Sequence, residues 1–248
     1  MKAVVMGGGL GSRLRPALPA PINKHLAPVG DRPMIYHVLK TLYDGGVTDV
    51  VMSLNWIHPG LMLETVVNFD DIPINIVYTY SAGFKGGPAR DLRQVAPWLR
   101  GEDAFVLMLG DSLFFSPLDF VTPQAPHIWT MPLTGIDDPR KYGQVRVDGD
   151  RVLEIREKPS TLFSETIQTG VWKLPADAFL RAQKLADSRD GELHIGDITC
   201  TYVTDGSMTH TPLRARSYID CGTVDALAYA SKRILGKKRP QRVTRAAE

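Results

Sequence analysis

Short apolar runs alternate with segments of helical periodicity through the first half of the chain. Strands are predicted at residues 3–6, 50–54, 72–78 and 104–109, where apolar runs or apolar–polar alternation have strand length. Helices are predicted between them, at residues 34–42, 61–68 and 89–99, where apolar positions recur with helical spacing. Gly45-Gly46 stops the first helix, and Pro97 weakens the last. This alternation predicts a parallel sheet that is covered on both faces.

The second half has a different pattern, with a hairpin and shorter strands. The hairpin is predicted at residues 145–155 around the turn Asp148-Gly149. Further elements are predicted as strands at residues 169–173 and 217–219 and as helices at residues 175–187, 197–205 and 224–235. The chain shows no internal repeat and no linker, so we expect one continuous domain over residues 1–235 and a frayed tail over residues 236–248.

Composition narrows the class of protein. The chain has 248 residues, of which 44% are hydrophobic, and this is enough for one large core. No run approaches the 18 apolar residues that a membrane span needs, and the start of the chain has no signal-peptide pattern. The two cysteines, Cys200 and Cys221, do not make a disulfide framework. These features favour a cytoplasmic protein with no membrane partner.

The net charge of +2 is unevenly distributed. Residues 232–248 contain seven Lys and Arg residues and one Glu, so this tail carries +6 and the rest of the chain −4. An acidic body argues against a nucleic-acid partner, because such proteins present a basic surface to the phosphate backbone.

The first predicted strand runs into a glycine-rich loop, with four glycines among residues 7–11, followed by Arg13 and Arg15. Such a loop lets the backbone approach a ligand closely and directs N–H groups at phosphate oxygens. Its spacing is not that of a dinucleotide fingerprint, because Ser12 and Leu14 stand where glycines are required, and no Gly-Lys-Ser/Thr follows as in a P-loop. A plain turn at a strand end is the alternative, but the arginines favour phosphate chemistry.

A long signature begins in this loop and continues along the chain. It comprises residues 8–16, Lys24, Pro28-Val29 and residues 32–35. Further motifs are Leu109-Gly110-Asp111, residues 138–143, Glu157-Lys158-Pro159, Thr169-Gly170, Gly191-Glu192-Leu193 with Asp197-Ile198, and residues 219–223. In this order the series resembles the sugar-1-phosphate nucleotidylyltransferases, and within them the glucose-1-phosphate thymidylyltransferases, over residues 2 to about 235.

The resemblance implies an α/β fold, a three-layer sandwich with a mainly parallel Rossmann-like sheet and an inserted antiparallel sugar-binding portion. It implies an enzyme that transfers a nucleoside monophosphate from a nucleoside triphosphate to a sugar 1-phosphate and releases pyrophosphate. The family usually forms homo-oligomers, so a homo-oligomer is expected.

Two aspartates are candidates for binding Mg²⁺. Asp111 follows a buried strand, and Asp220 follows a short one, so both are expected at the sheet edge where ligands bind in open α/β sheets. Taken alone, either residue is a common turn or helix-cap residue. The resemblance favours the metal role, because both positions match the family's metal-binding aspartates, and carboxylates with phosphate oxygens are the ligands that Mg²⁺ prefers.

The resemblance also implies roles for the other candidate site residues. Arg13 and Lys24 are the expected catalytic residues, which stabilise the departing pyrophosphate and neutralise the reacting phosphates. Nucleotide binding is expected of Gly8, Gly9, Gly11, Ser12, Arg13 and Gly87. Sugar binding is expected of Tyr142, Gly143, Glu157, Lys158, Thr169 and Gly170. The segment between Pro16 and Lys24 is one residue longer than the family pattern, so the loop is expected to be reshaped.

The base and the acceptor stay open. The polar residue that the family places near Ala82, often a glutamine for thymine or uracil, is absent, so the sequence does not fix the base. The resemblance favours dTTP and UTP, while CTP or GTP with an unusual phosphorylated or phosphonate acceptor is the alternative. A protein that binds nucleotide sugars without turning them over is a further alternative. The presence of Arg13, Lys24, Asp111 and Asp220 argues against it.

Overall fold

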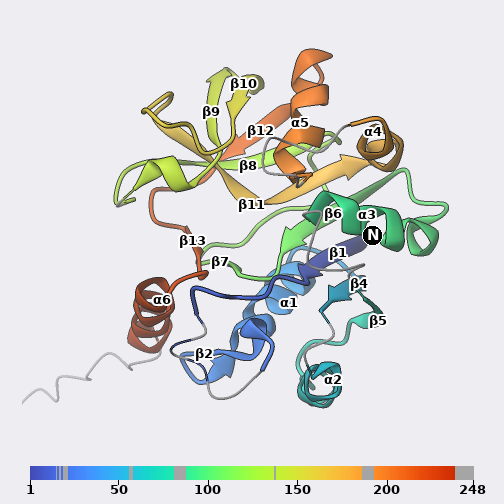
Figure 1. The fold of residues 1–248 in the computed structure, drawn as a ribbon, viewed down its shortest axis with the longest axis vertical. Helices are drawn as coiled ribbons and strands as arrows, with labels where there is room; N and C mark the ends of the chain where they lie inside the picture. The colour runs from blue at the N-terminus through green and yellow to red at the C-terminus, as the bar shows by residue number, and fades with distance from the viewer. Residues whose placement is uncertain are drawn as a thin grey trace, which may run out of the picture.

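One large sheet forms the centre of the molecule. The computed structural model describes residues 1–14, 16, 18, 22–55, 58–80, 88–136, 138–185 and 193–237. The strands of the large sheet are β1 (Lys2–Gly7), β4 (Asp49–Leu54), β5 (Asn75–Tyr80), β6 (Ala104–Leu109), β8 (His127–Pro132), β9 (Gln144–Asp148), β10 (Arg151–Arg156), β11 (Thr166–Pro175) and β12 (Thr209–Pro212). Their order is β5-β4-β1-β6-β11-β8-β12-β10-β9. Helices lie on both sides of this sheet (Figure 1).

The strands β5, β4, β1 and β6 pair in parallel throughout. Helices cover both faces of the sheet. The helices α1 (Met34–Asp44) and α2 (Pro59–Val66) lie on one face, and α3 (Pro88–Val95), α4 (Ala178–Lys184) and α5 (Ile195–Thr204) lie on the other, where α5 packs on β10. Successive residues of β1 point to opposite faces: Ala3 and Val5 pack in the core beneath α1 and α2, while Val4 and Met6 pack with α3, α4 and α5. The apolar run at residues 3–6 is therefore buried on both faces, as the sequence predicts.

The second half continues the same sheet. The long strand β11 pairs antiparallel with both β6 and β8, and β9 pairs antiparallel with β10. The strand β12 returns parallel to β8. The predicted antiparallel portion is thus joined to the parallel half through β11, and the predicted α/β class with a layered, Rossmann-like architecture is confirmed.

Two short ribbons stand apart from the large sheet. They are formed by β7 (Ser112–Phe114) with β13 (Tyr218–Asp220) and by β2 (Pro28–Val29) with β3 (Arg32–Pro33). The last helix, α6 (Val224–Lys237), lies beside β2 and β13, as Figure 1 shows. Leu14, Met34 and Ala230 pack in a separate core cluster beneath this helix. The ribbon of β7 and β13 carries part of the candidate site.

Element ends follow the local signals in the sequence. Gly45 caps α1, as predicted, and α3 gives way to a 3-10 turn, η3 (Ala96–Leu99), that contains Pro97. The helix α4 begins at Ala178, whereas it is predicted from Pro175, which instead ends β11. The predicted tail lies outside the described residues from 238 onwards. No helix in the described ranges combines the length and apolar character that crossing a bilayer requires.

Candidate active site

The glycine-rich loop after β1 lies against the side chain of Lys24. Gly11 adopts φ +65°, and a Cβ there would lie 2.7 Å from the Lys24 Cβ. A Cβ at Gly9 would lie 3.4 Å from the Lys24 Nζ. The Asn55 amide donates a hydrogen bond of 3.1 Å to the Gly9 carbonyl. Glycine is required at position 11 both for its backbone conformation and for this close approach.

Lys24 is held by a short 3-10 turn, η2 (Lys24–Leu26), which Asn23 caps by accepting a 3.0 Å hydrogen bond from the His25 amide. The Lys24 Nζ lies 2.5 Å from the Asp111 Oδ2, and the two side chains are 12% and 13% exposed. Burial lowers the pKa of His25 to about 3, with the Lys24 charge acting in the same direction, so this imidazole is neutral. Lys24 is therefore the cation that faces Asp111.

The β7–β13 ribbon brings Asp111 and Asp220 together. Asp220 pairs with Ser112 in the ribbon, and the Cys221 amide donates to the Asp111 carbonyl at 2.9 Å. Burial and then the charge of Asp111 raise the pKa of Asp220 to about 6. Burial pushes the pKa of Asp111 in the same direction, but the charge and hydrogen bond of Lys24, together with smaller contributions, leave the pKa of Asp111 lowered. The Asp111 and Asp220 carboxylates thus repel each other, and the positive charge of Lys24 offsets part of this repulsion.

This pair suits a divalent cation in its donor atoms and its charge. Carboxylate oxygens are the ligands that Mg²⁺ prefers, and an added cation relieves the repulsion that raises the pKa of Asp220. One oxygen of Asp220 accepts a 2.7 Å hydrogen bond from the Gly222 amide. In the described ranges no group of three or more His, Cys, Asp and Glu side chains surrounds a common point. Bound phosphates or water would therefore supply the remaining ligands.

Arg13 reaches the same place from the glycine-rich loop. Its side chain is exposed, and a Cβ at Gly222 would lie 2.9 Å from both the Arg13 Nη2 and the Asp220 Oδ1. The absence of a side chain at position 222 leaves the guanidinium room beside Asp220. Arg13, Lys24, Asp111 and Asp220 therefore form one cluster of alternating charge.

The opposite wall comes from the second half of the sheet. Glu157 and Lys158 follow β10, with 3.7 Å between the Glu157 Oε1 and the Lys158 Nζ. Lys158 adopts φ +42°, a left-handed conformation that is unusual for a residue with a side chain. The Thr169 hydroxyl donates to the Trp129 carbonyl at 2.8 Å. Tyr142 lies beside Tyr218, with 6.5 Å between ring centroids.

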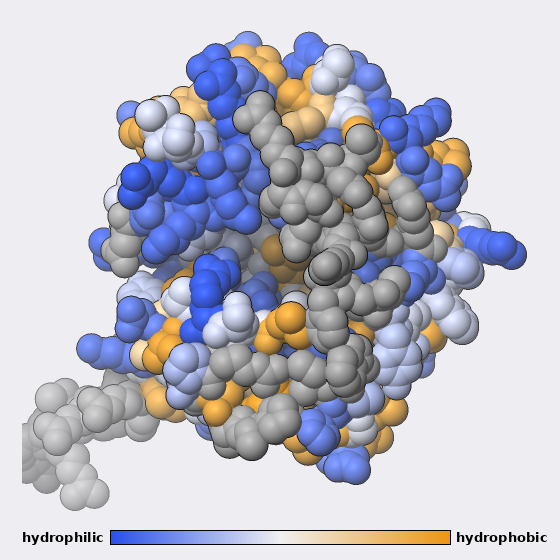
Figure 2. All heavy atoms as spheres, viewed as in Figure 1, coloured by the Kyte–Doolittle hydropathy of each residue, from blue (hydrophilic) through white to orange (hydrophobic). Residues whose placement is uncertain are grey.

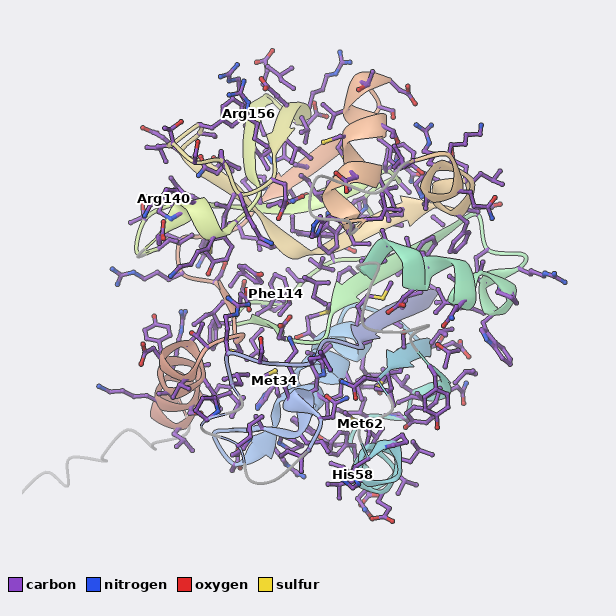
Figure 3. The ribbon with its side chains drawn as sticks, viewed as in Figure 1. Met34, His58, Met62, Phe114, Arg140 and Arg156 are labelled. Atoms are coloured by element: carbon purple, nitrogen blue, oxygen red, sulfur yellow. The ribbon has the colours of Figure 1, made fainter. Side chains whose placement is uncertain are left out.

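A cavity of 640 Å³ lies between these two walls. Ten of the residues predicted from the sequence line it: Arg13, Lys24, Asp111, Tyr142, Gly143, Glu157, Lys158, Thr169, Gly170 and Asp220. Figure 2 shows hydrophilic residues gathered above this hollow, and Figure 3 shows Arg140, one of the lining residues, at the outer edge of the molecule. The chain thus brings the predicted phosphate-binding and sugar-binding residues to one cavity.

Four predicted nucleotide-binding residues, Gly8, Gly9, Gly11 and Ser12, lie in the loop beside Lys24 and not on the cavity wall. Gly87 lies outside the described residues. Gln168, Trp172 and His194 also line the cavity, and the sequence does not predict them as site residues. Gln168 had a usable signal, since it is a polar residue in the buried strand segment next to the Thr169-Gly170 motif.

A cavity that sets cations for phosphate groups against paired carboxylates, at the end of an α/β sheet, is typical of enzymes that act on nucleotides. Comparison with known proteins identifies the family of enzymes within this class. Residues 2–237 match the model of the nucleotidyl transferase family, and the chain belongs to that family. The resemblance to the sugar-1-phosphate nucleotidylyltransferases is confirmed, and the chain is an enzyme of the nucleotidyltransferase class.

Three similar proteins illustrate the relationship. A glucose-1-phosphate thymidylyltransferase of Mycolicibacterium smegmatis is 28% identical over 236 residues, which are 93% of this chain and 81% of the relative. One from Actinoplanes sp. is 30% identical over 233 residues, covering 90% and 75%. A crystal structure from Bacillus anthracis, named as a glucose-1-phosphate thymidylyltransferase in complex with a sucrose, superposes with a TM-score of 0.84 at 28% identity and 97% coverage of both chains.

Proposed function

We propose that the chain transfers a nucleoside monophosphate from dTTP or UTP to a sugar 1-phosphate, with glucose 1-phosphate as the favoured acceptor, and releases pyrophosphate. The observation that carries the proposal is that one cavity joins the Arg13, Lys24, Asp111 and Asp220 cluster to the Glu157 and Lys158 wall. The names of the relatives support the acceptor class, since those compared above are named as glucose-1-phosphate thymidylyltransferases.

The chain's own residues serve mainly to position and neutralise the reacting groups. An oxygen of the sugar phosphate attacks the α-phosphorus, and the bond from this phosphorus to the β-phosphate bridging oxygen breaks, so that the electron pair leaves with pyrophosphate. Both partners are anions, so charge is the main obstacle. Lys24 can exchange its contact with Asp111 for phosphate oxygens, and Arg13 can bind the departing pyrophosphate from the loop.

Asp111 and Asp220 would hold Mg²⁺, which supplies further positive charge to the phosphate oxygens when bound. The glycine-rich loop would offer backbone N–H groups to the triphosphate. On the opposite wall, Glu157 would accept hydrogen bonds from sugar hydroxyls and Lys158 would contact the sugar phosphate. Tyr142, Gly143, Thr169 and Gly170 would complete that subsite.

A panel of substrates tests the proposal. Five nucleoside triphosphates are combined with glucose 1-phosphate and other sugar 1-phosphates, with Mg²⁺ or with a chelator, and pyrophosphate release and the nucleotide-sugar product are both measured. We expect Mg²⁺-dependent product with dTTP or UTP and glucose 1-phosphate. Product formed only with CTP or GTP, or only with another acceptor, would keep the reaction class and change the proposed substrates. Silence in every combination would overturn the proposed activity.

A further inference from the structure

Three side chains form a hydrogen-bonded series along the sugar side of the cavity. The Trp172 indole Nε1 donates to the Gln168 Oε1 at 3.4 Å, and the Gln168 Nε2 donates to the Glu157 Oε2 at 3.1 Å. Gln168 is 6% exposed and Trp172 is 4% exposed, so both are buried, and both lie on the cavity wall. This series is named the Gln168 relay below.

The relay has only one possible direction. An indole nitrogen donates and cannot accept, so the amide oxygen of Gln168 must face Trp172 and the amide nitrogen must face Glu157. The Glu157 oxygen on the receiving side then accepts a hydrogen bond. Glu157 is therefore held as an acceptor, and a ligand group that pairs with it must donate, as a hydroxyl does.

A local irregularity in β11 makes the relay possible. In an even strand, residues four positions apart lie about 13 Å from each other. In the pairing of β11 with β8, however, Gln168 lies opposite Thr130 and Trp172 lies opposite Ile128. A span of four residues along β11 therefore pairs with a span of only two along β8, and the extra residues of β11 form a bulge. The Thr169 hydroxyl ties the resulting bulge to the Trp129 carbonyl. Bulges beside active sites commonly redirect side chains, and this one brings Trp172 to Gln168.

Two glycines fix the position of the amide. The Gln168 backbone amide donates to the Gly143 carbonyl at 2.8 Å, and a Cβ at Gly143 would lie 2.2 Å from the Gln168 Nε2. A Cβ at Gly196 would lie 3.2 Å from the Glu157 Oε2. Side chains at either position would push the amide or the carboxylate out of place. The amide and the carboxylate are thus packed between two backbone segments.

We propose that Gln168, oriented by Trp172, is a positioning residue that fixes Glu157 as a hydroxyl acceptor in the sugar subsite. This inference rests on the proposed function, in which Glu157 contacts the acceptor. It narrows the acceptor class to sugar 1-phosphates that present a free hydroxyl toward Glu157. Without the relay Glu157 gains rotational freedom, so binding of the acceptor weakens while binding of the nucleotide is unaffected.

The test compares Gln168→Leu, Gln168→Glu and Trp172→Phe in the full chain. Gln168→Leu and Trp172→Phe should raise KM for glucose 1-phosphate about tenfold, equal to about 1.4 kcal/mol, with KM for dTTP unchanged. Gln168→Glu should raise it further, because two carboxylates then face each other. Trp98→Phe is the control, since Trp98 is an exposed tryptophan of η3 that neither lines the cavity nor takes part in the bulge, and its KM values should stay at the wild-type level.

Two further measurements separate positioning from damage to the fold. In a Glu157→Ala background Gln168→Leu should have little additional effect on the acceptor KM, because the carboxylate that Gln168 positions is already absent. Each monodeoxy analogue of glucose 1-phosphate lacks one hydroxyl. The analogue that binds the wild type most weakly, relative to glucose 1-phosphate, should bind Gln168→Leu almost as well as glucose 1-phosphate does. Full additivity, an unchanged acceptor KM, or an equal rise in the dTTP KM would each overturn the proposal.

Failure of the proposed function has a different signature. If the wild-type chain neither binds nor converts any sugar 1-phosphate, the function is wrong, and the relay is then judged by NMR. The Trp172 indole proton should exchange slowly with solvent in the wild type and faster in Gln168→Leu. Rapid exchange in the wild type would overturn the relay as well.

Discussion

Lys24 joins the glycine-rich loop to a carboxylate of the candidate site. The loop glycines pack on its methylene groups, and its ammonium faces Asp111. A lysine buried between a phosphate-binding loop and a carboxylate is placed to neutralise two anions that approach each other. In the proposed reaction we therefore expect its contribution in the transition state, in which both phosphates are close.

Replacement of Lys24 by alanine should lower kcat about 10²- to 10³-fold at saturating Mg²⁺, because one preorganised positive group is lost from the reacting phosphates. Steady-state kinetics measures the loss, and circular dichroism checks that the variant is folded. Lys40→Ala removes a partly exposed lysine of α1 that pairs with Asp44 and lies over the Tyr43 ring, and it serves as the control because Lys40 does not line the cavity. Near-normal kcat in a folded Lys24→Ala variant would show that this cation is not catalytic.

His127 gives the fold a pH dependence that is separate from the chemistry. Burial lowers the pKa of His127 to about 4, with the charges of His210 and Lys173 acting in the same direction. The unfolded chain has an ordinary histidine pKa near 6.5, so between about pH 6.5 and 4 it binds more protons than the folded chain. The free energy of unfolding should therefore fall as pH falls through this window, by about 2 kcal/mol from this residue.

Urea unfolding at pH 7 and pH 4.5 measures this loss, and His127→Gln is the comparison. Glutamine can still bond with Thr209 and Thr211, the partners of His127, but it does not titrate. The variant should lose less stability than the wild type between the two pH values. Equal losses in the two proteins would assign the pH dependence to other groups.

At the scale of elements, β11 passes very close to the β7–β13 ribbon at Gly170. A Cβ at Gly170 would lie 1.8 Å from the Ser112 Oγ, so Gly170→Ala should force the ribbon away from the sheet and destabilise the fold by about 1 to 3 kcal/mol. The ribbon also carries Asp220, so kcat should fall too. Gly60→Ala is the control, because nothing lies within 4 Å of a Cβ there and alanine favours α2. Thermal unfolding of both variants should give opposite signs.

Elements with a clear apolar period could be predicted from the sequence, and polar ones could not. The helix α1 and the strands β1, β4 and β6 follow their apolar pattern closely. The strand β12 is Thr-His-Thr-Pro and shows no such pattern, so it is not predicted. Its partner β8 contains Ile128, Trp129 and Met131 and is not predicted either. Their buried polar groups bond to each other, as His127 does with Thr209 and Thr211, and this pairing exists only once the chain has folded.

The same distinction explains which site residues could be predicted. Asp111 is a candidate because of its place just after a buried strand, and the family resemblance then favours a metal-binding role for it. Gln168 and Trp172 come within hydrogen-bonding distance because of a bulge in β11, and this bulge depends on the pairing of β11 with β8. No local pattern encodes that pairing, so the relay could not be derived before the sheet was known.

At the scale of the whole molecule, the cavity is built from both halves of the sheet, and ligands should therefore stabilise the entire fold. dTTP with Mg²⁺ at about 100 times its Kd should add about 2.7 kcal/mol, or about 5 to 10 °C in Tm. A thermal shift measurement tests this, with thymidine as the ligand control because it lacks the phosphates. A shift with dTTP that is unaffected by a chelator would argue against Mg²⁺ at Asp111 and Asp220.

The strand order also has a consequence for synthesis of the chain. The parallel strands β5, β4, β1 and β6 are complete by residue 109, whereas β11, which pairs with the free side of β6, ends at residue 175. On the ribosome the glycine-rich loop and Asp111 are therefore made before the opposite wall of the cavity, which carries Glu157 and Gly170. Until β11 emerges, β6 is an open strand edge, which is the kind of surface on which nascent chains aggregate.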